Sequence, residues 1–215
     1  MKLYFAPLAC SLATRIALYE AGAAAQFEFV DIHKDPYARP LPDGSDYRRI
    51  NPMGQVPAIQ ADDGTVVTEN TAVLLFVAEN FPAAKLVPAT GIQRLRLFEW
   101  MSFIATELHK ATFIPLLDPH SSAEVKDYAR QKLPLRFGHL EEHLALRTSL
   151  LDHFSIADCY LVTVLNWTRA TGIALARWPA IQTWFSATTQ RPSVARALEE
   201  EGQLWYALQK RLGMR

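Results

Sequence analysis

The sequence predicts a small α/β domain followed by an all-helical domain, and three observations carry this prediction. Strand-like and helix-like patterns alternate over residues 1–81. Residues 82–91, PAAKLVPATG, contain two prolines and a glycine, which is typical of a linker. Over residues 92–215 the strand signals disappear and only helical patterns remain.

The amino-terminal pattern indicates a β-α-β unit. Lys2–Phe5 is a short aromatic-rich strand, and apolar residues at helical spacing from Ser11 onward indicate a helix that stops at Gly22. The alternating segment Phe27–Ile32 is consistent with a second strand. Two strands joined through a helix are expected to be parallel, with a right-handed crossover.

The rest of this domain adds a loop, a hairpin and a helix. Residues 33–55 are rich in Pro, Asp, Gly and Arg, and they indicate a surface loop with a short helix near Asp46–Ile50. VPAIQADDGTVVTEN indicates two strands around an Asp63–Gly64 turn, and NTAVLLFVAENF is a helical run closed by Pro82. This order predicts a thioredoxin-like domain, in which helices pack on a mixed four-stranded sheet.

The second domain is expected to be a helical bundle. One long helical pattern over residues 94–113 is broken at Pro115, and a second over residues 123–147 contains Pro134, which predicts a kink. Three more helices are expected, at Ser155–Gly172, Pro179–Gln190 and Ser193–Gln209.

Composition narrows the function classes. The 22 Lys and Arg residues equal the 22 Asp and Glu residues, so overall charge offers no attraction to nucleic acid or anionic membrane. No apolar run is long enough to span a bilayer. The two cysteines, Cys10 and Cys159, are far apart and form neither a disulfide framework nor a zinc-binding pattern, which favours a reducing, cytoplasmic location.

Cys10 lies in APLACS, where the first strand gives way to the first helix. PLAC resembles a lipoprotein cleavage site, but the stretch before it is too short for a signal peptide. The positive end of a helix favours a thiolate, which would make Cys10 a ligand-binding or nucleophilic thiol. The alternative is a packed hydrophobic residue, because cysteine outside disulfides is commonly buried.

Two further motifs are expected near the same end of the sheet. In NPMGQVPAI, a cis Val56–Pro57 bond would leave the Val56 backbone able to pair with an extended peptide, although most such bonds are trans. In TEN, Glu69 and Asn70 can bind an ammonium and a carboxylate, although the same residue types also cap helices. Ligands of α/β folds bind where these three motifs are expected, beyond the strand ends.

The chain resembles the glutathione transferases, and most closely their bacterial beta class, which carries a cysteine near residue ten. The matching windows are KLYFAPLACSL, INPMGQVPAI, VTEN, EWMSFIATELHK, FSIADCYLVTVLNW and QRPSV, so the resemblance spans nearly the whole chain. It implies the glutathione transferase fold, with a glutathione-binding domain at 1–81 and an electrophile pocket in the helical domain at 92–215.

The resemblance also implies roles for individual residues. Val56, before a cis Pro57, would pair with the cysteinyl backbone of glutathione, and Glu69 would bind its γ-glutamyl end. Asn70 replaces the usual serine or glycine, and its amide still offers hydrogen bonds to a carboxylate. The glutathione-binding residues that the resemblance implies are Cys10, Lys34, Gln55, Val56, Pro57, Glu69, Asn70, Ser102 and His109.

Catalysis is assigned by the same resemblance to Cys10, Ser11 and His109. Ser11 would donate its hydroxyl to the thiolate. His109 would line the site from a small polar helix face with Ser102, Ala105 and Thr106, and a solvated surface histidine is the alternative.

The implied electrophile pocket is assigned to Leu8, Phe113 and Trp167. Leu8 is bulkier than the usual glycine or serine and is expected to narrow this pocket and change the substrate range. The alternative for Trp167 is a core position, which an aromatic residue on a helix more often occupies. Ser155 and Asp158 form a capping-box pattern with a role in folding, and Cys159 is expected to be packed and inert.

The resulting prediction is an enzyme that conjugates the glutathione thiolate to small apolar electrophiles in detoxification. It would use glutathione as co-substrate and would need no metal. It is expected to bind neither nucleic acid nor a membrane, and to form a homodimer. Two alternatives stay open, which are thiol-disulfide exchange through Cys10 and a non-catalytic ligand-binding role of the same fold.

Overall fold

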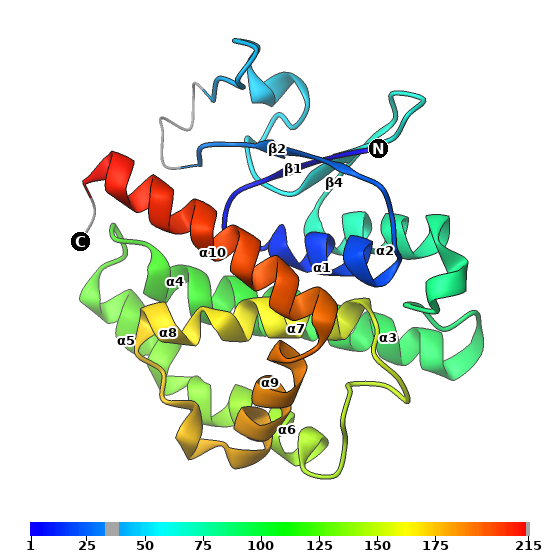
Figure 1. Ribbon diagram of the computed structural model, residues 1–215. Coiled ribbons are helices and arrows are strands. Elements are labelled where there is room, and N and C mark those ends of the chain that lie inside the picture. The colour runs from blue at the N-terminus through cyan, green and yellow to red at the C-terminus, as the bar shows by residue number, and fades with distance from the viewer. Residues whose placement is uncertain (33–38, 214–215) are drawn as a thin grey trace. The chain divides into compact units, whose positions relative to one another are not determined.

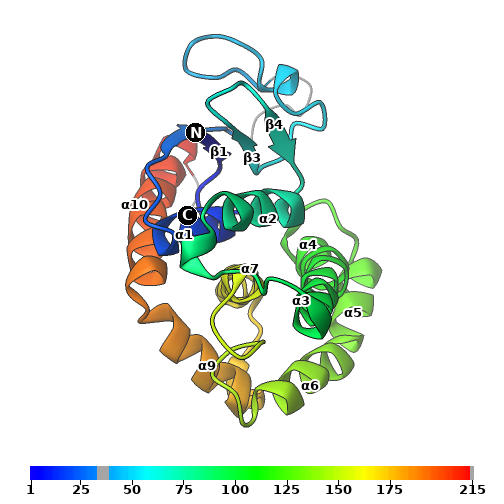
Figure 2. The same cartoon turned by 90° about the vertical axis from the view of Figure 1, so that its right-hand side faces the viewer.

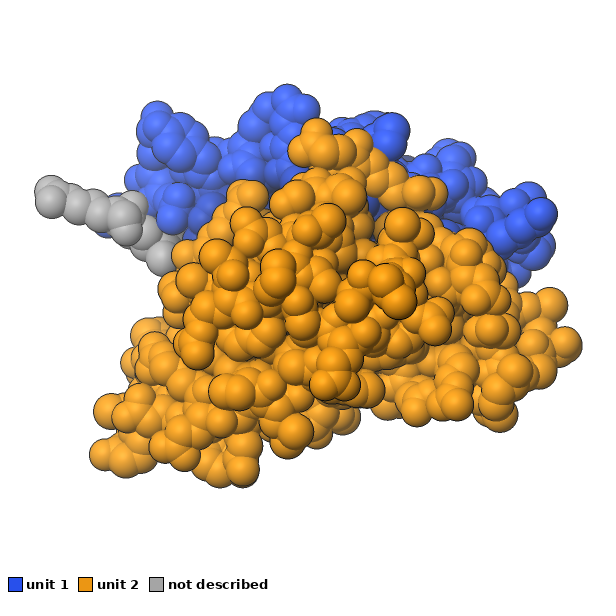
Figure 3. Space-filling view, turned by 90° about the horizontal axis from the view of Figure 1, so that it is seen from below, with its two compact units in different colours: residues 1–86, 192–215 blue, residues 87–191 orange. Residues whose placement is uncertain are grey.

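A computed structural model describes residues 1–32 and 39–213 of the 215-residue chain. The chain divides into two compact units (Figure 3), one of residues 1–86 with 192–215 and one of residues 87–191. This division differs from the predicted one at the carboxyl end, where the last helix belongs with the sheet domain rather than with the helical domain. The helical pattern of that segment indicates a helix but carries no information on what the helix packs against.

The first unit contains a four-stranded mixed sheet in the order β2-β1-β3-β4. The strands are β1 (Lys2–Phe5), β2 (Gln26–Phe29), β3 (Ala58–Gln60) and β4 (Val66–Thr68). β1 pairs with β2 in parallel and with β3 antiparallel, and β3 pairs antiparallel with β4. The predicted β-α-β unit and the hairpin are therefore confirmed.

Helices α1 (Leu12–Glu20) and α2 (Asn70–Asn80) lie against one face of this sheet (Figure 1). α1 is almost entirely buried because it also packs against α2 and against α10 (Pro192–Leu212). A cluster of buried side chains on and beside the sheet forms part of the core. It consists of Tyr4, Ala6, Val30, Leu41, Tyr47, Val56 and Ala58. Short 3₁₀ turns at Tyr47–Arg49 and Pro82–Ala84 connect these elements.

The second unit is all-helical, as predicted. Its first helices are α3 (Gly91–Phe103), a π-helical stretch (Ile104–Phe113) and α4 (Ile114–Leu117). They are followed by α5 (Ala123–Gln131), α6 (Leu133–Leu144), α7 (Ile156–Asn166), α8 (Thr168–Thr171), a 3₁₀ turn at Leu175–Arg177, and α9 (Pro179–Thr189). Every residue of α7 is buried, and Figure 2 looks along this helix with α3, α6 and α9 around it.

Pro134 separates two helices instead of kinking one. α5 ends at Gln131, and α6 begins at Leu133 with the proline in its first turn. Proline disfavours helical geometry in the residue before it, and it is tolerated in a first turn because its missing N–H has no partner there anyway. The predicted continuous helix is therefore divided at Lys132.

The predicted capping box begins α7. The Asp158 carboxylate accepts from the Ser155 N–H at 2.9 Å, from the Ser155 hydroxyl at 2.8 Å and from the Leu150 N–H at 2.8 Å. Asp158 is completely buried, and burial raises its pKa to about 6. These bonds join the helix start to the segment before it, which supports the predicted role in folding. Among the described residues, no helix combines the length and apolar character that crossing a bilayer requires.

Candidate functional site

Cys10 lies in the turn that leads from β1 into α1. Its thiol donates to the Val56 carbonyl oxygen at 3.1 Å, which joins the turn to the segment before β3. The Ala13 N–H bonds the Cys10 carbonyl at 3.2 Å, so the turn continues directly into the first turn of α1. The side chain is only partly buried. A sulfur at this position experiences the positive end of the α1 dipole.

Ser11 is occupied within the protein. It has no exposed surface, and its hydroxyl accepts from the Ala6 N–H and donates to the Ala6 carbonyl, both at 3.2 Å. A serine hydroxyl has a single hydrogen to donate. The predicted donation from Ser11 to a ligand thiolate is therefore not supported, because this hydrogen already closes the Ala6–Ser11 turn.

The Val56–Pro57 bond is cis, as the resemblance implied. The turn before it is fixed through the Gln55 carbonyl, which accepts from the Tyr47 hydroxyl at 2.8 Å and from the Asn51 side-chain amide at 2.7 Å. The side chain of Gln55 is exposed, whereas Val56 and Pro57 are buried.

Glu69 and Asn70 lie at the same end of the sheet as Val56. Ala58 pairs with Thr68 in the β3–β4 ladder, so the residues before Ala58 and those after Thr68 continue side by side. Glu69 is exposed, and its φ of 66° is in the left-handed region that disfavours a side chain. Such strain is typical of ligand-binding positions.

Asn70, the first residue of α2, is the unusual polar group of this site. Its side chain is only 8% exposed, yet neither the amide nitrogen nor the amide oxygen has a hydrogen-bond partner. Nearly all buried polar atoms in proteins are paired, so an unpaired amide calls for an explanation. A ligand group that accepts from the nitrogen and donates to the oxygen would satisfy it.

His109 belongs to the second unit and is buried rather than on a polar face. Its Nδ1 is 2.6 Å from the Tyr160 hydroxyl, and its ring contacts Trp167 at 4.9 Å between centroids. Ser102 and Thr106, predicted on the same face, are exposed. The cause is the π-helical stretch, in which backbone N–H groups bond carbonyls five residues back, as the Ile114 N–H does to the His109 carbonyl. The 3.6-residue period therefore does not apply there.

Burial lowers the pKa of His109 to about 3, with a smaller contribution from Lys110, so the imidazole is neutral at pH 7. In the unfolded chain it would be protonated below pH ~6.5. Folding stability is therefore present above that pH and is lost as the pH falls toward the folded pKa. We expect His109→Gln to remove about 2 kcal/mol of the stability loss seen between pH 7 and 5 in urea unfolding. The exposed His120→Gln serves as control, and an equal pH dependence in the wild type and His109→Gln would contradict this assignment.

The residues predicted for the electrophile pocket have different surroundings. Phe113 has no exposed surface and packs against Trp167 at 5.7 Å and Phe137 at 6.4 Å between ring centroids. It is therefore a core residue in this structure rather than a pocket wall. Trp167 is 8% exposed, and Leu8 is partly buried with a φ of 57°. Lys34 lies outside the described residues.

Sequence reasoning missed three side chains that hold these groups in place. The Glu201 carboxylate accepts from the Leu8 N–H and from Arg15, and Tyr160 bonds His109. Glu201 is far from Leu8 in the sequence, so no local pattern could have revealed the contact. Tyr160 follows Cys159 in a helix that is buried all round, and a hydroxyl there was a signal that a polar partner must exist.

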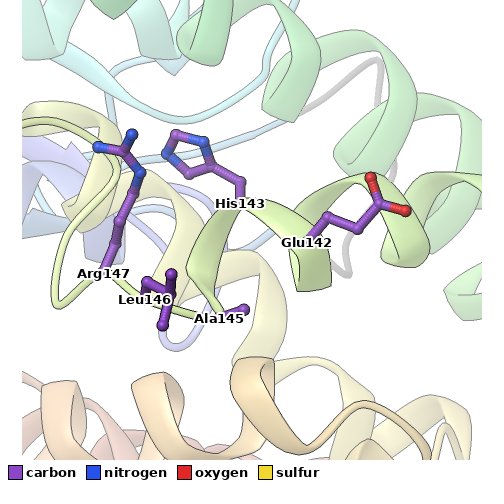
Figure 4. A pocket seen from close by; sticks show the side chains of 5 residues that line it. All are labelled: Glu142, His143, Ala145, Leu146 and Arg147. Atoms are coloured by element: carbon purple, nitrogen blue, oxygen red, sulfur yellow. The ribbon is translucent and has the colours of Figure 1, made fainter.

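Cys159 is buried within α7, as predicted. A surface hollow of about 550 Å³ lies at the carboxyl end of α6 (Figure 4), and none of the predicted site residues lines it. Its lining residues are Glu142, His143, Ala145, Leu146 and Arg147. Within residues 1–32 and 39–213, no three His, Cys, Asp or Glu side chains gather as metal ligands.

Comparison with known proteins matches both parts of the chain to one family. Residues 9–80 match the glutathione S-transferase N-terminal domain, and residues 103–192 match the glutathione S-transferase C-terminal domain. Glutathione S-transferase GstA of Escherichia coli O157:H7 is 39% identical over 204 residues, which cover 94% of this chain and 99% of the relative.

Solved structures agree with this match. The ternary complex of BphK, a bacterial glutathione S-transferase, has a TM-score of 0.88 and 41% identity, and the match covers 94% of this chain and all of that one. The beta-class enzyme of Sphingomonas chungbukensis has a TM-score of 0.86 and 40% identity, with 94% and 99% covered. The chain belongs to the glutathione S-transferase family and is similar to bacterial members that include a beta-class enzyme.

Proposed function

We propose that this transferase binds glutathione at the Cys10, Val56, Glu69 and Asn70 end of its first unit and transfers the thiolate to small apolar electrophiles. The observation that carries the proposal is Asn70, whose buried amide is unpaired on both atoms. The α-amino acid end of the γ-glutamyl group supplies what that amide lacks, a carboxylate that accepts and an ammonium that donates. A sphingomonad relative, 41% identical, has been solved with glutathione bound.

The tripeptide would extend from this end toward Cys10. Its cysteinyl backbone would pair with Val56, and its sulfur would lie beside the Cys10 thiol at the start of α1. There the helix dipole favours the thiolate over the thiol. The Cys10 S–H, which donates to the Val56 carbonyl in this structure, can turn to donate to the ligand sulfur.

The reaction needs no dedicated base. The glutathione thiol loses its proton to solvent on binding, and the thiolate then attacks the electrophilic carbon and forms a C–S bond as the leaving group departs with its electron pair. Steady-state turnover of an aryl halide with glutathione tests the activity. Absence of turnover with aryl halides, epoxides and activated alkenes would contradict the proposed reaction.

Asn70→Ala separates the functional from the structural role of this residue. Because the amide is buried without a partner, its removal is expected to leave the free energy of unfolding unchanged or to raise it by about 1 kcal/mol. Glutathione affinity is expected to fall about tenfold, for the loss of about 1.4 kcal/mol of hydrogen bonding.

Calorimetric titration and urea unfolding of the same samples measure both quantities. Asn80→Ala at the other end of α2, whose amide donates to the Phe76 carbonyl, is the control. If Asn70→Ala bound glutathione as well as the wild type, the proposed position of the γ-glutamyl group would be wrong.

Thiol-disulfide exchange is a second candidate, because Cys10 is in no disulfide and its side chain is only partly buried. Its thiolate would attack a glutathione mixed disulfide, form a Cys10–glutathione disulfide and release the other thiol. A second glutathione thiolate would then regenerate Cys10 and leave as oxidised glutathione. Loss of this activity in Cys10→Ala, with conjugation retained, would support it.

The proposal also covers the oligomeric state of the enzyme and its location in the cell. Ile92 and Leu95 on α3 expose 63% and 64% of their surface, and Phe98 exposes 36%, which supports a homodimer that covers them. Sedimentation of the wild type against Leu95→Glu tests it. That Cys10 and Cys159 are in no disulfide supports a cytoplasmic location, where thiols stay reduced.

A further inference from the structure

Glu201 on α10 is a buried carboxylate that reaches the turn before Cys10. It has no exposed surface. One carboxylate oxygen accepts from the Leu8 backbone N–H at 2.7 Å, and the other accepts from the Arg15 Nε at 2.8 Å. Arg15 is itself only 4% exposed, and its guanidinium lies over the rings of Phe5 and Phe27.

Few charged groups act on Glu201. Among the described residues, Arg15 from α1 and Glu200 from the same helix act on its charge, and Glu200 in turn bonds Arg15 and Tyr19. Burial raises the pKa of Glu201 to about 7, whereas Arg15 and the Leu8 N–H oppose the rise. The ion pair thus only partly offsets the cost of burying the carboxylate.

Stability alone does not account for this arrangement. A buried ion pair is often no more stabilising than apolar side chains of similar volume. Apolar side chains would, however, remove the bond between the Leu8 N–H and the Glu201 carboxylate. What the carboxylate adds is therefore a specific bond to the backbone of the turn.

That bond fixes a strained residue. Leu8 has a φ of 57°, and the left-handed region costs a side-chain-bearing residue about 1–2 kcal/mol. The turn is closed from two sides, because Ser11 bonds Ala6 and Glu201 bonds Leu8. Cys10 follows Leu8 by two residues, and its sulfur direction toward the Val56 carbonyl depends on this backbone.

We propose that Glu201 is a positioning residue for Cys10, which holds Leu8 in its left-handed conformation and thereby directs the Cys10 thiol toward the sulfur of bound glutathione. The inference rests on the proposed glutathione site. It adds a residue from the carboxyl-terminal helix to a site whose other members come from the strand ends and helix starts of residues 1–81.

The test compares three variants. Glu201→Gln keeps the size of the side chain but removes its charge and one of its two acceptor oxygens. The double variant Arg15→Met, Glu201→Met replaces the ion pair by apolar side chains and preserves packing, but it removes the Leu8 acceptor. Glu199→Gln, exposed on the same helix, is the control. For each variant we would measure urea unfolding, glutathione affinity by calorimetry, and the rate at which oxidised glutathione forms a mixed disulfide with Cys10.

We expect the double variant to stay folded but to unfold at a lower urea concentration than the wild type, because it removes the Glu201 acceptor of the Leu8 N–H. It is expected to bind glutathione within threefold of wild type, because Glu69 and Asn70 are untouched. Its Cys10 is expected to react at least tenfold more slowly, with Glu201→Gln in between. A folded double variant with wild-type Cys10 reactivity would overturn the positioning role and leave the proposed function intact. If the wild type itself failed to bind glutathione, the proposed function would fail instead.

Discussion

Replacing Glu69 by alanine is expected to weaken glutathione binding by well over tenfold. The Glu69 side chain is exposed at the start of α2 and makes no capping hydrogen bond, so helix capping does not explain its strained φ of 66°. A charge-assisted hydrogen bond to the γ-glutamyl ammonium would explain it, and such bonds contribute about 1.5–3 kcal/mol. Calorimetric titration with glutathione measures the loss.

Two further variants sharpen this prediction. Glu69→Gly is expected to relieve the backbone strain and raise the free energy of unfolding by about 1 kcal/mol while it loses the same affinity as Glu69→Ala. Glu79→Ala, exposed near the other end of α2, removes the same charge and is expected to bind normally. Unchanged affinity in Glu69→Ala would refute the proposed orientation of the tripeptide.

The largest loss of stability is expected from Asp158→Ala. This change removes the acceptor of three hydrogen bonds and leaves the N–H groups of Leu150 and Ser155 buried without partners. Each unsatisfied buried donor costs about 1–3 kcal/mol, so we expect the free energy of unfolding to fall by about 3 kcal/mol. Thermal and urea unfolding measure it.

The control for Asp158 is Asp127→Ala, which removes an exposed carboxylate with a single surface ion pair to Arg130. Such surface changes are expected to alter stability by less than about 0.5 kcal/mol. Asp158→Asn should recover part of the loss, because its amide oxygen still accepts one bond. If Asp158→Ala and Asp127→Ala were equally stable, the capping box would not be the folding element described here.

Much of the first unit was predictable because its signals are local. Alternating residues, Gly22 and the Asp63–Gly64 turn mark the strands and the ends of α1 with little help from the rest of the chain. The same holds for the capping box at Ser155, whose partner lies three residues away. The positions of Cys10, Val56 and Glu69 follow from these elements, since the ladder that pairs Ala58 with Thr68 brings the two motifs together.

The errors arose where distant contacts or irregular geometry decide the outcome. His109 was assigned to a polar face by a 3.6-residue period that the π-helical stretch does not follow. Ser11 was predicted to donate to a ligand thiolate, but its hydroxyl accepts from the Ala6 N–H and donates to the Ala6 carbonyl. Glu201 has no neighbouring motif, and its contact with Leu8 spans 193 residues. Long-range pairs of this kind cannot be seen in the spacing of a single sequence.

The central claim is that the start of α1 keeps the sulfur of bound glutathione negatively charged. The direct test is to follow the isotope-labelled cysteinyl β-carbon of glutathione by NMR while the saturated complex is titrated with base, because this signal is separate from that of Cys10. We expect the pKa of the bound thiol to lie at least about one unit below that of free glutathione, which corresponds to about 1.4 kcal/mol of preference for the thiolate. A bound thiol that titrates as it does in solution would contradict the account.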